Sequence, residues 1–306
     1  MLPLRASKQF NDFKMTSITY QSDTQPLKRV LLKHARDAFG NQSKLDEQAI
    51  ALNYLGIPNY DEAVRQYDAF ANLLEQAGVQ TEFLAADKIT TLDSVYVRDN
   101  AVVSDSGVVL CNMGKAARAV ETAEQARFYA SDTLTILPPM PEGATLEGGD
   151  VVWLNNDILA VGQGYRTNAA GISYLHEHLT SAKEIITVPQ PHFRGPSDVL
   201  HIMSMISPIS DDLAVIYSPL MSVSFRERLM DEGYRFVEVP EHEYDTLGCN
   251  ILTIEPGVVI MAEGSPDTQK ALEKVGVKVH TFAGSEISVK GCGGPTCLTR
   301  PLERAL

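Results

Sequence analysis

One cysteine near the C-terminal end of the sequence has a setting that suits chemistry. Cys297 lies in the stretch Gly291-Cys-Gly-Gly-Pro-Thr-Cys-Leu-Thr-Arg-Pro-Leu302. The glycines and the proline before it predict a turn, which would let the carbon of a ligand approach the thiol closely. Isolated cysteines more often pack as small buried hydrophobes. A catalytic role for Cys297 therefore depends on partners elsewhere in the chain.

Three other stretches supply such partners: Ser94-Val-Tyr-Val-Arg-Asp99, Glu147-Gly-Gly-Asp150 and Val199-Leu-His-Ile-Met-Ser204. Each alone has a structural explanation, namely a buried ion pair, a turn and a core histidine. Together they match nucleophilic catalysis, which combines a thiol with an acid–base histidine and an orienting carboxylate. Asp99, Glu147 and His201 thus join Cys297 as candidate site residues.

The two carboxylates constrain the substrate. Two acids beside a thiol raise its pKa and suppress the nucleophile. A cationic substrate removes this difficulty, and a guanidinium is planar, always charged and offers a fork of N–H donors to carboxylates. Its charge would favour the thiolate of Cys297, while Asp99 and Glu147 would hold its carbon against the sulfur. Attack on a guanidinium gives a neutral tetrahedral centre, so no oxyanion hole is required.

A sequence repeat explains how these distant residues could meet. The pattern is two short strands around a turn, a helix and another strand, and it recurs with a period of about 50 residues. Corresponding strand ends fall 48 to 54 residues apart, at Asp99, Glu147, His201, Cys249 and Cys297. Five such ββαβ units are too small to bury their own apolar faces, so they would pack into one ring-like α/β domain. Equivalent strand ends would then converge on a common centre.

Alternation and helical spacing predict the individual elements. Strands are expected at 27–33, 79–84, 94–97, 101–103, 108–111, 133–137, 151–154, 158–161, 184–188, 199–207, 213–218, 235–239, 250–254, 258–261, 277–282, 286–290 and around 297. Helices are expected at 61–74, capped by Asp61, and near 117–130, 167–179, 222–232 and 266–275. The strand near Cys297 and the strand at 27–33 would complete the fifth unit. Residues 1–25 are expected to form a loose tail, and residues 26–306 a single catalytic domain.

Composition restricts the class of protein. The 306 residues carry a formal net charge of -13, which disfavours partners such as nucleic acid and anionic membranes. Four cysteines are too few for a disulfide framework, and no second cysteine–histidine cluster completes a zinc site. The N-terminus lacks the apolar region of a secretory signal, and no apolar run could span a membrane. We therefore expect a cytoplasmic protein without a metal or an organic cofactor.

The chain resembles the guanidine-modifying enzymes of the pentein (amidinotransferase-like) superfamily, and in particular the dimethylarginine dimethylaminohydrolase family. The likeness extends from about Leu27 to Arg304 and rests on five stretches: Asp93-Ser-Val-Tyr-Val-Arg-Asp99, Leu146-Glu-Gly-Gly-Asp150, Gly164-Tyr-Arg-Thr-Asn168, Leu200-His-Ile-Met-Ser204 and Gly293-Gly-Pro-Thr-Cys-Leu298. It implies a five-bladed αβ propeller with pseudo-fivefold ββαβ repeats. It also implies hydrolysis of an Nω-substituted arginine to citrulline and an alkylamine through a covalent cysteine intermediate.

The resemblance also implies a role for each site residue. Cys297 would be the nucleophile, and His201 the general acid and then the general base. Glu147 and Asp99 would hold the guanidinium. The amino-acid end of the substrate would meet Asp93 at its α-amino group, Arg166 at its α-carboxylate and Arg118 as a second carboxylate contact. A homodimer is a further expectation.

Three departures leave related activities open. Arginine deiminases carry an aspartate two residues after the histidine, whereas this chain has Met203, which suits an alkylated guanidine. Dihydrolases tend to have asparagine at the position of Asp99, and here Asn100 is adjacent. Dimethylaminohydrolases often have an acidic residue where this chain has Arg98. Arginine deiminase, arginine dihydrolase and amidinotransferase are therefore the alternatives. A non-catalytic pentein-fold protein that binds ribosomes is another, but such proteins lack the aligned cysteine, histidine and acids.

Overall fold

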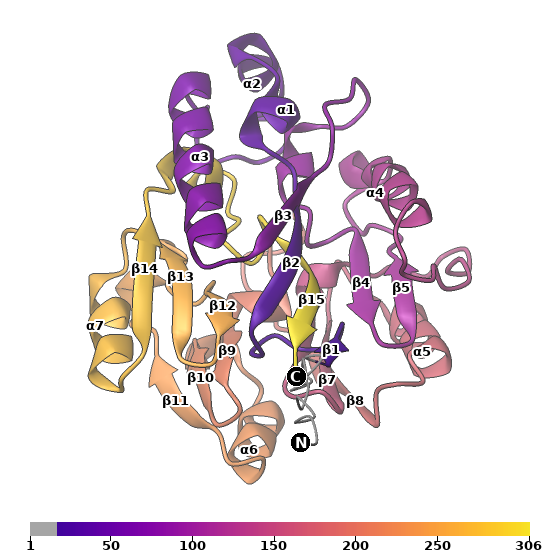
Figure 1. The fold of residues 1–306 in the computed structure, drawn as a ribbon, viewed down its shortest axis with the longest axis vertical. Coiled ribbons are helices and arrows are strands. Elements are labelled where there is room, and N and C mark those ends of the chain that lie inside the picture. The colour runs from indigo at the N-terminus through magenta and orange to yellow at the C-terminus, as the bar shows by residue number, and fades with distance from the viewer. Residues whose placement is uncertain (1–16) are drawn as a thin grey trace, which may run out of the picture.

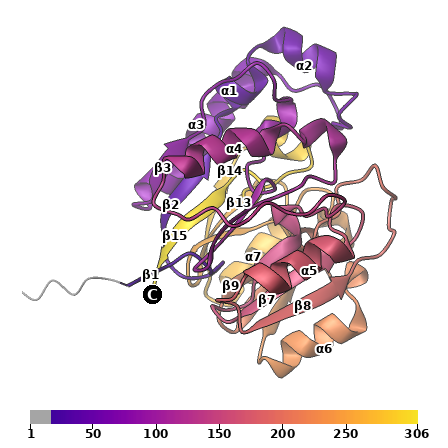
Figure 2. The same cartoon turned by 90° about the vertical axis from the view of Figure 1, so that its right-hand side faces the viewer.

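Five small β-sheets arranged around a centre make up the described part of the chain, residues 17–306, in a computed structural model (Figure 1). In three of the sheets an antiparallel pair of strands comes first, and a helix then crosses over to a parallel partner. Helices α4 (Glu121–Ala130) and α5 (Ala169–His178) lie on the outer side of the molecule, facing the viewer in Figure 2. None of the helices in residues 17–306 combines the length and apolar character needed to cross a bilayer.

Three sheets repeat the ββαβ pattern in full. The first contains β6 (Val151–Trp153), β7 (Ile158–Gln163), α5 and β8 (Glu184–Pro189). The second contains β9 (Ile206–Ser210), β10 (Leu213–Ile216), α6 (Val223–Asp231) and β11 (Arg235–Glu238). The third contains β12 (Leu252–Glu255), β13 (Val258–Ala262), α7 (Pro266–Lys274) and β14 (Lys278–Phe282).

The other two sheets contain variations. In one, β4 (Ala101–Ser104) and β5 (Gly107–Leu110) precede α4, and a single parallel bridge from Val108 to Ile136 replaces the strand expected at 133–137. In the other, β15 (Arg300–Ala305) pairs with β2 (Leu27–Leu32), which runs parallel to β3 (Gln80–Phe83). Helices α1 (Ala35–Phe39), α2 (Gln42–Gln48) and α3 (Tyr60–Gln76) lie between β2 and β3. Strands from the first described residues and from the C-terminal segment therefore complete this sheet, which confirms the predicted five-unit architecture.

Helix α3 begins slightly earlier than expected. The side chain of Asn59, not that of Asp61, caps it by accepting a hydrogen bond from the backbone N–H of Glu62. Asp61 instead lies in the first turn, where its negative charge interacts favourably with the positive end of the helix dipole. Tyr67, Phe70 and Leu74 form the buried face, as their helical spacing predicts.

Three strands predicted near the site are wrong. Residues 92–95 form a 3₁₀ turn, and residues 285–289 form a π-helical turn. His201 caps a third turn at Ile202–Ser204, and β9 begins only at Ile206. A short buried segment can alternate between apolar and polar residues even when it forms a tight turn. Periodicity over four or five residues therefore does not distinguish a strand from such a turn.

The predicted tail at 1–25 is too long at its C-terminal end. Residues 1–16 lie outside the described part of the chain. After them, β1 (Ile18–Thr19) pairs with β15. Asp23 is buried, and its carboxylate accepts hydrogen bonds from the Arg98 guanidinium and from the Trp153 backbone N–H, both at 2.8 Å. This segment therefore packs as part of the domain.

Replacing Asp23 with alanine should destabilise the domain by about 3–5 kcal/mol, because the Arg98 guanidinium would remain buried without its charge partner. Urea unfolding measures this change. The exposed pair of Lys183 and Asp157 provides the control, since Lys183→Ala should cost at most about 1 kcal/mol. Equal free-energy changes in the two variants would contradict the anchoring role of Asp23.

Candidate active site

The candidate residues lie where the chain approaches the first strand of each sheet. Asp99 precedes β4, Glu147 precedes β6, His201 precedes β9 and Cys297 precedes β15. The imidazole Nε2 of His201 lies 2.8 Å from Glu147 Oε2, and its Nδ1 lies 3.9 Å from Asp99 Oδ1. Three of the predicted residues therefore meet directly, although they come from three different sheets.

Two glycines allow Glu147 and His201 to approach. A β-carbon at Gly148 would lie 2.2 Å from the Arg98 carbonyl oxygen, and one at Gly149 would lie 2.4 Å from His201 Nδ1. No other residue type fits at either position, because the atoms in the way include backbone and a buried ring. The Glu-Gly-Gly-Asp stretch is a turn, as its composition suggests, and it is also what brings the carboxylate to the imidazole.

Glu147 is fully buried, and three residues donate hydrogen bonds to its carboxylate. The donors are His201 Nε2, the Lys115 backbone N–H at 3.0 Å and the Arg166 guanidinium, which lies 3.2 and 3.4 Å from the two oxygens. Burial alone would raise the pKa of Glu147, but the hydrogen bond and charge of His201, with the charge of Arg166, hold it well below its ordinary value. Glu147 is therefore an anion at neutral pH.

His201 is buried and surrounded by acids. Burial alone would lower its pKa, but the charges of Asp99 and Asp150 and the hydrogen bond with Glu147 raise the pKa of His201 to about 9. Asp150 also accepts a 3.1 Å hydrogen bond from the backbone N–H of Ile202, which helps to fix the turn that carries the imidazole. At neutral pH His201 is protonated and able to donate a proton.

Cys297 is buried with its thiol next to an amide. Asn250 Nδ2 donates to Cys297 Sγ at 3.3 Å, and Asn250 Oδ1 accepts from both the backbone N–H and the hydroxyl of Thr296. Burial, followed by the negative charge of Asp99, raises the pKa of Cys297 to about 11, against the opposing hydrogen bonds of Asn250 and Thr296. Without an added positive charge the sulfur is a thiol at neutral pH.

The three acids expected to contact the substrate, Asp93, Asp99 and Glu147, each form an ion pair with a basic side chain of the protein. Arg118, which is buried, contacts Asp99 and also Glu121, whereas Arg166 contacts Glu147. Lys115 Nζ lies 2.6 Å from the Asp93 carboxylate. Arg118 and Arg166 thus lie beside the predicted guanidinium ligands, and their contact with a substrate carboxylate stays a prediction.

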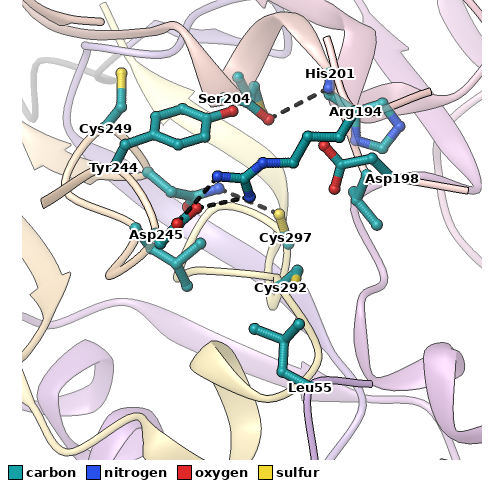
Figure 3. A pocket seen from close by; sticks show the side chains of 14 residues that line it. Leu55, Arg194, Asp198, His201, Ser204, Tyr244, Asp245, Cys249, Cys292 and Cys297 are labelled. Carbon is teal, nitrogen blue, oxygen red and sulfur yellow. Dashed lines mark hydrogen bonds and ion pairs between the residues drawn. The ribbon is translucent and has the colours of Figure 1, made fainter. Parts of the chain in front are cut away.

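Two cavities meet at the thiol and the imidazole. One, of about 30 Å³, is lined by Asp93, Asp99, Arg118 and Arg166 together with His201 and Cys297. The other, of about 210 Å³, is lined by His201 and Cys297, by apolar side chains and by the charged Arg194, Asp198 and Asp245 (Figure 3). His201 and Cys297 are therefore accessible from both spaces.

Asp99, Glu147 and His201 could also hold a metal ion, because each offers a ligand atom within 4.8 Å of the others. A second group with this property is His242, Glu243 and Asp267, whose histidine and aspartate are exposed. In the buried group a cation would compete with the guanidinium groups of Arg118 and Arg166 for the same carboxylates. The buried donor set thus suits cations in general, including an organic one.

Sequence reasoning missed Asn250, Lys115 and the positioning role of Asp150. Asn250 had a usable signal, because the repeat places Cys249 at the position equivalent to Cys297 and Asn250 is the next residue. Lys115 had none, since a lysine in a loop is usually solvated.

Comparisons with known proteins agree with the geometry. The family model of eukaryotic N,N dimethylarginine dimethylhydrolase matches residues 39–304. An N(G),N(G)-dimethylarginine dimethylaminohydrolase from Streptomyces coelicolor is 30% identical over 240 residues, covering 78% of this chain and 84% of that protein. An arginine deiminase from Listeria welshimeri is 28% identical over 252 residues, covering 68% of this chain but only 61% of the longer deiminase.

A solved structure confirms the fold. The dimethylarginine dimethylaminohydrolase of Pseudomonas aeruginosa, complexed with citrulline, superposes with a TM-score of 0.69 at 22% identity and covers 92% of this chain and all of that one. The five-sheet arrangement is therefore the pentein propeller.

Proposed function

The chain belongs to the dimethylarginine dimethylaminohydrolase family of guanidine-modifying enzymes, and from this premise we propose that it hydrolyses an Nω-substituted arginine to citrulline and an alkylamine. The observation that carries the proposal is the shared position of Cys297 and His201. Both line the same two cavities, next to the buried carboxylates of Asp99 and Glu147. A thiol, a protonated imidazole and two anions form a site for a flat cation with an electrophilic carbon.

Substrate binding would exchange one set of ion pairs for another. The substrate guanidinium takes positions on Asp99 and Glu147 that Arg118 and Arg166 contact now. The two arginines are then free to bind the α-carboxylate, and the α-amino group meets Asp93. The exchange leaves no charge buried alone, which is the arrangement that costs most.

Binding would also activate the nucleophile. The pKa of Cys297 is raised to about 11, mainly by burial and by Asp99. A guanidinium against Asp99 cancels that negative charge and adds a positive one next to the sulfur, so the pKa of the thiol falls. Cys297 therefore releases its proton to solvent and becomes a thiolate when the substrate is present, which protects it from other electrophiles.

The reaction then proceeds in two halves. The Cys297 thiolate forms a C–S bond to the guanidinium carbon, His201 gives its proton to the substituted nitrogen, and the C–N bond breaks to release the alkylamine. Water next attacks the carbon of the S-linked intermediate while His201 takes a proton from it. The C–S bond breaks and its electron pair returns to the sulfur. The product then loses the remaining hydroxyl proton to solvent and leaves as citrulline.

Met203 favours a substituted guanidine over free arginine. It is buried and contributes to the wall of the 210 Å³ cavity beside Cys297. A carboxylate at this position would pair with an unsubstituted guanidinium nitrogen, whereas a thioether can pack only against an alkyl group. Arginine deiminase activity is the second candidate, and the 28% identity to the Listeria deiminase is what favours it.

Product analysis tests the proposal. The protein is incubated with arginine, Nω-methylarginine and Nω,Nω-dimethylarginine, and citrulline, ornithine, ammonia and alkylamine are each measured. We expect citrulline and alkylamine in equal amounts from the methylated substrates, at a kcat/KM at least tenfold above that for arginine. Faster release of ammonia from arginine would identify a deiminase, ornithine a dihydrolase, and no product from any of the three would contradict the proposal.

A further inference from the structure

The 210 Å³ cavity next to Cys297 is larger than one or two methyl groups need. On this scale a cavity needs about 10–15 Å³ to hold one water molecule, so the space would hold several atoms beyond a dimethylamino group. Its wall is mainly apolar, with Val199, Met203, Tyr244 and Leu247 among the lining residues. A small leaving group alone does not account for a space of this size and lining.

The direction of the substrate follows from the charges. Asp93, Asp99, Arg118 and Arg166 all line the smaller cavity, so the charged amino-acid end belongs there under the proposed function. In the larger cavity the one arginine, Arg194, is already held by Asp245 through two hydrogen bonds of 2.8 and 3.0 Å. Since the guanidinium carbon must lie at Cys297, where the two cavities meet, the substituted nitrogen points into the larger one.

Figure 3 shows how this cavity is arranged. The side chains of Tyr244 and Cys249 lie on the side of Cys297 opposite Leu55, and Arg194 extends toward Asp245. Arg194 also packs over the Phe193 ring at 4.8 Å and near the Tyr244 ring at 6.0 Å. Arg194 and Asp245 thus satisfy each other, and Met203 and Leu247 leave an apolar part of the wall for a ligand group.

We propose that the 210 Å³ cavity is a subsite for the Nω substituent, and that the substrate class includes arginines whose guanidine bears an unbranched alkyl group of about four carbons. This inference rests on the proposed function. The alkyl chain lies against Met203 and Leu247, and the amine released after C–N cleavage leaves through this cavity. The balance of the reaction is unchanged: water is consumed, and butylamine and citrulline are formed.

A substituent series tests the subsite. The wild-type protein is assayed with Nω-methyl-, Nω-propyl- and Nω-butylarginine, and with Nδ-butylarginine, whose added group lies on the nitrogen facing the smaller cavity. Each methylene buried in an apolar site adds up to about fourfold. We therefore expect kcat/KM for the butyl substrate to equal or exceed that for the methyl substrate, and Nδ-butylarginine to be hydrolysed at least 100-fold more slowly.

A cavity-filling variant locates the alkyl chain. Leu247 already carries a β-carbon at φ 66°, so Leu247→Trp fills space without new backbone strain. It should lower the butyl-to-methyl ratio of kcat/KM at least tenfold, and Met203→Phe serves as a second filling variant if the first does not fold. Val223→Trp, at an exposed site on α6, is the control and should leave the ratio unchanged.

Failure of the inference differs from failure of the proposed function. Hydrolysis of Nω-methylarginine but not of the butyl substrate would overturn the subsite alone. An unchanged ratio in Leu247→Trp and Met203→Phe, or equal rates for the Nδ and Nω isomers, would also overturn it, because the alkyl group would then lie elsewhere. No turnover of any methylated arginine would instead refute the proposed function.

Discussion

Replacing Cys297 with serine should reduce kcat for Nω-methylarginine by on the order of 10⁴–10⁶-fold, the range seen when members of a catalytic triad are removed. His201→Ala should reduce kcat by on the order of 10²–10⁴-fold, the usual contribution of general acid–base catalysis. Both variants should still bind substrate, because Asp99 and Glu147 keep their charges. Steady-state kinetics and isothermal titration calorimetry separate the two effects.

Two comparisons make this prediction specific. The variant that combines Cys297→Ser with His201→Ala should be no less active than Cys297→Ser alone. The losses in kcat caused by residues that act as one unit do not add. Cys111→Ser, also a substitution of a buried cysteine, should keep wild-type turnover because Cys111 lines neither cavity of the site. Full activity in Cys297→Ser would contradict the role of Cys297 as the nucleophile. An activity loss in Cys111→Ser as large as that in Cys297→Ser would contradict it too.

The positions of the central residues could be predicted from the sequence because a repeat converts spacing into geometry. Asp99, Glu147, His201 and Cys297 recur at nearly constant intervals, and equivalent positions in a closed ring face the same centre. The ring also explains why β15, at the C-terminus, must pair with β2. Such an argument requires only that five similar units pack alike.

Local detail at the centre could not be predicted in the same way. The contact of Asn250 with Cys297 Sγ depends on a turn in which Leu247 has φ 66° and its carbonyl accepts from the Asn250 N–H. No local pattern signals a leucine in that conformation. The pairing of Lys115 with Asp93 depends likewise on where two loops of one unit come to lie. These contacts are set by tertiary packing, which periodicity does not report.

Substituting Glu147 with glutamine should change both the charge state of His201 and the rate. Burial opposes protonation of His201, and its raised pKa of about 9 depends on Asp99, Asp150 and Glu147. Without the Glu147 charge the pKa of His201 should fall toward its ordinary value of about 6.5. NMR of the His201 ring proton measures this titration directly. We expect kcat at neutral pH to fall by on the order of 10²–10⁴-fold, because less of the general acid is protonated and its ring is less well oriented.

The stability of the Glu147→Gln variant should depend on pH in a defined direction. A histidine whose folded pKa is raised stabilises the fold below its unfolded pKa, and this contribution is lost as the pH rises through about 9. Glu147, whose pKa is lowered, contributes above its own unfolded value and loses that contribution in acid. The stability deficit of the variant should therefore be largest between about pH 5 and 6.5 and should shrink above pH 9.

Glu243→Gln is the matched control, because Glu243 is a buried glutamate that caps α7 away from His201. It should destabilise the protein without moving the His201 titration, and a shift of equal size in both variants would show that Glu147 does not set the charge of His201.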